Sequence, residues 1–194
     1  MHKTMATLAV LTIGALTTPG SAASAACPEL PVYQRFAPWG DDAYYEEVPG
    51  GSFDEALSWT AVGAPELVEN AHPLDGSSAV RLRGGESITS PVLCVSKLHP
   101  HLRFLARAAD GKSRLKIEVL WSDQDGRHER KPLSVAQEHA KHYQSWTPTS
   151  DVGLKKVLPK GLEDVRDIQL RFSVREESGD WLVDDVFVDP FKRG

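Results

Sequence analysis

Charged and amide side chains stand at alternate positions of several strand-like segments. Arg103, Lys116, Gln169 and Arg171 each lie between apolar neighbours, so period-two alternation turns them away from a core. A guanidinium binds carboxylate or sulfate through paired hydrogen bonds. If their strands share a sheet, these four residues form a ligand face for an anionic polymer. The alternative is a solvated strand face that keeps the sheet soluble and blocks edge pairing.

No recognisable catalytic pattern accompanies this face. The sequence has no nucleophile elbow, P-loop, dinucleotide fingerprint or zinc-protease motif. His139 and His142 are three residues apart beside Glu138, but no third ligand follows at protease spacing. We therefore expect that the protein is not an enzyme, and a small polysaccharide-degrading enzyme is the remaining catalytic alternative.

One carboxylate stands in the last apolar strand. By alternation Asp184 shares a face with Leu182, Val186 and Val188, so we expect it to point into the core. A buried carboxylate needs an opposite charge, hydrogen-bond donors or a metal ion. Backbone amides or an arginine are alternative partners, and a β-bulge that turns Asp185 inward is another alternative.

Cys27 and Cys94 are the two cysteines of the chain. Two lone cysteines in an oxidising compartment most simply pair, and a loop of this length contributes roughly 4 kcal/mol in the chain-entropy model. The alternative is a lipid anchor on Cys27. Ser24 argues against it, because a lipobox usually has an aliphatic residue at that position.

Residues 1–26 have the features of a secretory signal peptide. A basic start at Lys3 is followed by an apolar run from Met5 to Leu16 and then by small residues up to Ala26. The apolar run is shorter than the roughly 20 residues that span a bilayer. We therefore expect a secreted, extracellular protein without a membrane span. The formal net charge of −5 disfavours nucleic acid as a partner.

Short alternating segments separated by proline and glycine predict many strands and few helices. One polar and one apolar face on each strand predicts antiparallel sheets, and two such sheets form a sandwich. Residues 27–49 contain four prolines and are expected to form an irregular, extended N-terminal segment on the surface. Residues 50–194 are expected to form the β-sandwich domain, within which residues 133–142 are compatible with a short helix.

The aromatic residues divide into two groups. Trp59, Trp146 and Trp181 lie in or beside strands, where core or rim packing is the usual role. Trp121 ends an apolar strand face and is expected to cap the core. Trp39, Tyr44 and Tyr45 lie in the N-terminal segment and are expected to be exposed, where they would stack on a sugar ring or contact a partner.

Three segments together resemble jelly-roll carbohydrate-binding modules of the galactose-binding-like superfamily, over about residues 50–190. Residues 50–55 followed by Trp59 resemble the first strand, residues 102–107 a central strand and residues 181–188 the closing strand with its Asp-Asp-Val core. The resemblance implies an all-β, two-sheet antiparallel jelly-roll β-sandwich. Asp54 stands where these modules usually have a glutamate, and we do not find the pair of aromatic residues with which they usually bind sugar rings. The superfamily hosts many functions.

The resemblance also implies one structural calcium ion that joins the first and last strands. Its ligands would be the Ser52 backbone carbonyl and the Asp54 and Asp184 carboxylates, with Asp75 as a weaker candidate. Calcium takes six to eight oxygen ligands, which these groups would begin to supply.

These expectations describe a secreted, non-catalytic module that binds a glycan or an anionic cell-surface polymer. The alternative is a structural or protein-interaction domain of the cell envelope without a sugar ligand.

Overall fold

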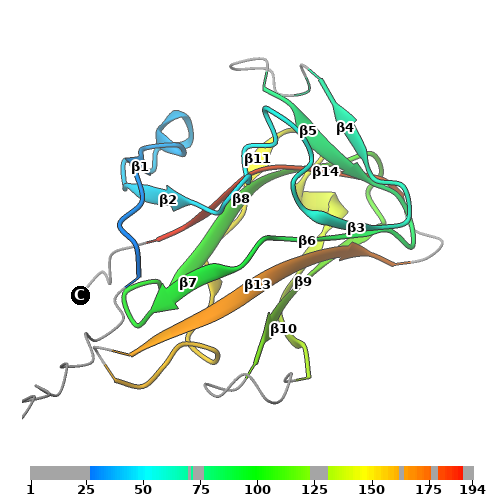
Figure 1. Cartoon of the computed structure of the whole chain (residues 1–194). Helices are drawn as coiled ribbons and strands as arrows, with labels where there is room; N and C mark the ends of the chain where they lie inside the picture. The colour runs from blue at the N-terminus through cyan, green and yellow to red at the C-terminus, as the bar shows by residue number, and fades with distance from the viewer. Residues whose placement is uncertain are drawn as a thin grey trace, which may run out of the picture.

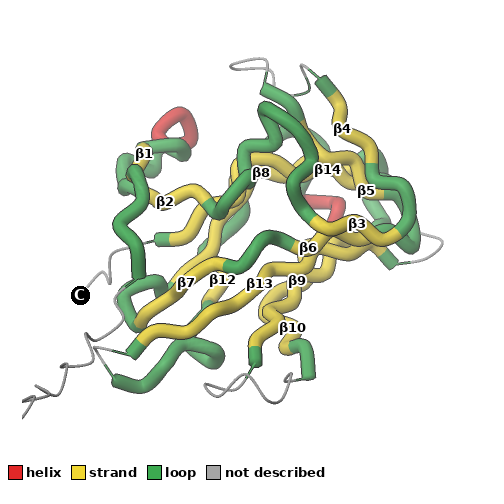
Figure 2. Tube along the Cα trace, in the orientation of Figure 1, coloured by secondary structure: helices red, strands yellow, loops and turns green. Residues whose placement is uncertain are grey.

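Two antiparallel sheets pack face to face in this computed structural model (Figure 1), which describes residues 27–69, 71, 77–122, 131–161, 164–175 and 179–189. The predicted signal peptide and Asp75 lie outside the described residues. Apart from strands, the described chain has two short 3-10 turns, η1 (Ala37–Trp39) and η2 (Ala140–His142) (Figure 2). The predicted antiparallel β-sandwich is confirmed.

Each sheet is built from segments far apart in the sequence. The first sheet, which we call sheet A, contains β1 (Val32–Tyr33), β2 (Tyr45–Glu47), β4 (Glu66–Val68), β5 (Ala79–Leu82), β8 (His101–Ala108), β11 (Thr147–Pro148), β12 (Val152–Gly153) and β14 (Trp181–Val188). The second, sheet B, contains β3 (Thr60–Val62), β6 (Ser87–Thr89), β7 (Leu93–Ser96), β9 (Arg114–Trp121), β10 (Leu133–His139) and β13 (Val165–Val174).

Alternate apolar residues of both sheets form the main core. Ile168, Leu170 and Phe172 of β13 are buried, as their period-two spacing predicts. Trp59 and Trp181 are also buried in this core, so their predicted packing role is confirmed. The outward positions of β9 and β13 are left for polar side chains.

The N-terminal segment is more ordered than its prolines suggest. Its strand β2 pairs with β14 and extends sheet A (Figure 1). The segment also carries Phe36 and Tyr45 into a second hydrophobic cluster with Leu105 and Phe187. Tyr45 is 1% exposed, so its predicted exposure is wrong, whereas Tyr44 is 49% exposed. The cause is burial of these rings against the outer side of sheet A, which offsets the weak local preference for regular structure.

Residues 133–142 form no α-helix. Residues 133–139 form strand β10, which pairs antiparallel with β9, and the pairing register shifts between Ser134 and Ala136. An irregularity of this kind breaks the alternation of side chains that identifies a strand in a sequence.

Candidate functional site

The predicted ligand face is divided between the two sheets. Arg103 lies on β8 in sheet A, whereas Lys116 on β9 and Gln169 and Arg171 on β13 lie in sheet B. The expectation that all four share one face is therefore wrong. Alternation gave the correct outward direction for each residue, but it contains no information on which strands join which sheet.

Arg103 is surrounded by the N-terminal segment. Its guanidinium lies 4.7 Å from the centre of the Phe36 ring and forms an ion pair with Asp41. Its Nε donates to the Thr149 carbonyl oxygen at 3.0 Å. The side chain is 13% exposed. Arg103 therefore joins the N-terminal segment to sheet A through a cation–π contact and charged hydrogen bonds.

An ion-paired group lies on the outer face of sheet B. Both Nε and Nη2 of Arg171 donate to Oε2 of Glu118, at 3.0 and 2.7 Å, and Nζ of Lys116 lies 2.6 Å from Oε1. Burial alone would raise the pKa of Glu118, but the hydrogen bonds and charges of Lys116 and Arg171 outweigh it and lower the pKa. Glu118 stays ionised and fixes the plane of the Arg171 guanidinium.

The same face continues into a small pocket. Gln169 is two residues before Arg171 on β13, and its Nε2 donates to the Ser90 carbonyl at 2.8 Å, which orients the amide. Gln169 also lines a pocket of about 200 Å³, whose wall includes Leu120 and Trp121 from β9. Trp121 pairs with Ile168 on the core-facing side and packs against the main core, whereas Leu120 pairs with Gln169 on the outer face. An apolar side chain beside an oriented amide suits a sugar ring, because its C–H face is apolar and its edge carries hydroxyls.

The closing strand carries a β-bulge at its two aspartates. Val183 and Val186 both face the main core, and the β14–β8 register shifts between Asp184 and Phe187. Asp185 takes φ 51°, a left-handed conformation that aspartate tolerates better than most residues. The predicted face shared by Leu182, Asp184 and Val186 is therefore wrong, because the extra residue reverses the alternation.

Both bulge carboxylates are buried, and each has its own partners. Asp184 accepts from the Ser77 hydroxyl at 3.0 Å and from the Asp185 backbone N–H at 2.7 Å. Burial, and then repulsion by Asp185, raise the pKa of Asp184. Asp185 Oδ2 lies 2.5 Å from Nε of Arg35 in the N-terminal segment. The sequence offers backbone amides or an arginine as alternative partners of Asp184; the structure gives Asp184 a backbone amide, and the arginine pairs with Asp185.

Two of the predicted calcium ligands, Ser52 and Asp54, line one pocket of about 230 Å³ together with Arg35 and Asp185. Asp54 accepts from the Ser78 backbone N–H at 3.2 Å, and Asp184 is not part of this lining. Among the described residues, no three carboxylate, histidine or cysteine side chains gather as a metal ion requires. Glu47 also lines this pocket, so its wall contains three carboxylates together with the Arg35 guanidinium, which is paired with Asp185. The calcium ion stays a prediction from the resemblance.

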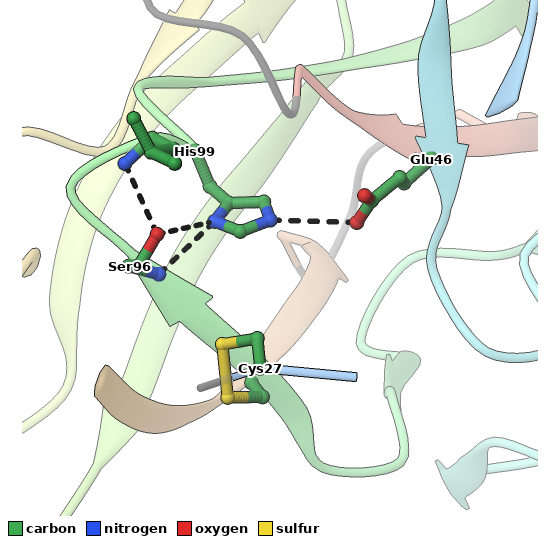
Figure 3. The surroundings of a disulfide bond; sticks show 6 residues. Cys27, Glu46, Ser96 and His99 are labelled. Atoms are coloured by element: carbon green, nitrogen blue, oxygen red, sulfur yellow. Dashed lines mark hydrogen bonds and ion pairs between the residues drawn. A yellow bond between two sulfur atoms is a disulfide. The ribbon is translucent and has the colours of Figure 1, made fainter. Parts of the chain in front are cut away.

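A Ser-His-Glu arrangement lies near the disulfide (Figure 3). His99 Nδ1 lies 3.2 Å from Ser96 Oγ, and its Nε2 lies 3.4 Å from Glu46 Oε2. The Ser96 backbone N–H also donates to Nδ1 at 3.0 Å, so this nitrogen is the acceptor and Nε2 carries the proton. His99 and Ser96 are buried and three residues apart in one turn. This geometry holds the turn after β7 against β2, beside the Cys27–Cys94 disulfide.

The disulfide itself is confirmed. Cys27 and Cys94 are bonded and join the start of the N-terminal segment to β7 of sheet B. The bond spans 67 residues of the sequence.

Comparison with known proteins finds similarity in structure only. No family model matches the chain, and no curated protein matches it. A xylan-binding domain from carbohydrate-binding module family 22 has a TM-score of 0.51 at 14% identity, over 79% of this chain and 99% of that one. The xylan-binding domain of Paenibacillus barcinonensis Xyn10C has a TM-score of 0.47 at 17% identity, over 74% and 94%. The family 11 module of Clostridium thermocellum Lic26A-Cel5E has a TM-score of 0.48 at 9% sequence identity, over 75% of this chain and 94% of that one. The fold of this chain is thus a jelly-roll β-sandwich like that of the family 22 xylan-binding domain.

Proposed function

We propose that this protein is a secreted, non-catalytic module that binds a glycan on the outer face of sheet B. The observation that carries the proposal is the pair of outward side chains on β13, the oriented Gln169 amide and the Glu118-held Arg171 guanidinium, with Leu120 beside Gln169 at the edge of the pocket of about 200 Å³. The jelly-roll fold supports it at the level of fold alone.

This pair provides hydrogen bonds for a ligand. Arg171 has five N–H donors, and Glu118 accepts from two of its nitrogens, so donors remain for ligand hydroxyls. Gln169 uses one N–H on Ser90 and keeps its carbonyl oxygen as an acceptor. Their positions on adjacent outward sites of one strand place them about 7 Å apart, on a rigid element.

Secretion is proposed from two features. Residues 1–26 have the sequence of a signal peptide, and the Cys27–Cys94 bond is stable in oxidising compartments. Within the part of the chain that the structure describes, we find no helix with the length and apolar character needed to cross a membrane.

Affinity electrophoresis of the processed chain in gels containing soluble polysaccharides tests the proposal. The panel should include xylan, a mixed-linkage glucan and an acidic polymer. Gln169→Ala and Arg171→Lys are the test variants, because lysine keeps the charge beside Glu118 but lacks the planar fork. We expect each to weaken binding about tenfold, since a lost hydrogen bond to a charged or oriented group costs about 1–2 kcal/mol.

Arg81→Ala is the matched control, because Arg81 forms an ion pair with Glu66 on sheet A, on the other side of the sandwich. It should bind like the wild type. Retention of full affinity by both sheet B variants would show that the ligand binds elsewhere, and absence of retardation by any polysaccharide would refute glycan binding.

A further inference from the structure

A second pocket lies at one end of the sandwich, where β7 leads into β8. Its volume is about 480 Å³, more than twice that of the pocket beside Trp121. It is lined by the basic side chains of Lys97, His101, Lys155 and Lys160 and by the apolar side chains of Pro100, Leu158 and Pro159. The lining contains no carboxylate, so the pocket is basic, although the chain as a whole carries a net charge of −5.

The lysines of this pocket differ from Lys116 in their charge partners. Lys116 is neutralised by Glu118 at 2.6 Å, whereas none of Lys97, Lys155 and Lys160 forms an ion pair with another described residue. Among the described residues, Asp189 is 3% exposed and lies 3.8 Å from His101 Nδ1, and Asp164 accepts from the backbone N–H of Gly161, which follows Lys160. Three like charges that converge on one concavity repel one another, and an anion that enters it relieves this repulsion.

We propose that this lysine pocket binds the negatively charged groups of an acidic polysaccharide, carboxylated or sulfated. The inference rests on the proposed function, because it names the class of glycan that the module takes. Lysine ammonium groups act as point charges and bind both carboxylate and sulfate groups. The proline and leucine side chains provide an apolar floor for the C–H face of a sugar ring, which a free inorganic anion would not need.

Isothermal titration of the processed chain with polygalacturonate, dextran sulfate and neutral xylan tests the pocket. The test variant is K155E/K160E. The control is K112E/K141E, which makes the same change in net charge at the far end of β8, about 20 Å away by strand length. We expect the test variant to lose about tenfold or more in affinity for the acidic polymers and to keep its affinity for xylan.

Salt dependence supplies a second measurement. Binding of the acidic polymers should weaken as salt rises from about 0.1 M to about 1 M, because the Debye length falls from about 10 Å to about 3 Å. Either anionic polymer supports the inference, and their relative affinities identify carboxylate or sulfate as the preferred group. Equal losses in the test and control variants would overturn it. Binding to xylan alone would overturn it and leave the proposed function intact, whereas no binding to any polymer would overturn both.

Discussion

Replacement of Arg103 by alanine separates a structural role from a ligand-binding role. The sequence placed Arg103 on a ligand face, but the structure places its guanidinium beneath the N-terminal segment, over the Phe36 ring and against Asp41. The substitution removes the donor to the Thr149 carbonyl as well. The substitution therefore removes the cation that the Phe36 ring, the Asp41 carboxylate and the Thr149 carbonyl share.

The magnitude follows from these contacts. A hydrogen bond to a charged group contributes about 1.5–3 kcal/mol, and a cation–π contact about 0.5–2 kcal/mol, with partial compensation when water enters the site. We expect Arg103→Ala to lower the free energy of unfolding by about 3 kcal/mol. For a domain of this size the melting temperature should fall by roughly 10 °C.

Urea unfolding followed by tryptophan fluorescence measures this loss. Arg107→Ala is the control, because Arg107 is exposed at an outward position of the same strand. The control should change stability by less than about 0.5 kcal/mol. Equal stability of the two variants, or loss of glycan binding by a fully stable Arg103→Ala protein, would refute the structural assignment.

Three further predictions concern the buried charges and the disulfide. The folded-state pKa of Asp184 is raised by burial and by Asp185, so the folded chain holds this proton more tightly than the unfolded chain. The free energy of unfolding should therefore fall as pH rises above the ordinary carboxyl pKa of about 4. Asp184→Asn should make urea midpoints depend less on pH between about pH 5 and about pH 8. An unchanged pH dependence in this variant would contradict the buried, protonated Asp184. The calcium ion implied by the resemblance should make the melting temperature higher in calcium than in EDTA, because Asp54 and Asp185 line one pocket, and coincident melting curves would refute the calcium site. Reduction of Cys27–Cys94 should lower the unfolding free energy by up to about 4 kcal/mol, and an unchanged urea midpoint after complete reduction would show that the crosslink contributes nothing.

Local patterns predicted much of the sandwich and part of the site. Alternation correctly gave the buried residues of β13 and the outward direction of Gln169 and Arg171. It failed at β14, because the extra residue of the bulge at Asp185 reverses the two faces. It also failed for the N-terminal segment, where Tyr45 is buried by contacts with residues distant in the sequence.

The sequence by itself determined the class of fold, the pairing of its two cysteines and the face of most strand residues, because these follow from side-chain period and from the number of cysteines. Only the tertiary structure decided which strands join each sheet, and hence that Arg103 stabilises sheet A while Arg171 faces outward from sheet B. It also decided that Lys97, Lys155 and Lys160 share one pocket. The physical reason is that period-two spacing specifies direction relative to one strand, whereas a binding site is defined by contacts among strands and loops far apart along the chain.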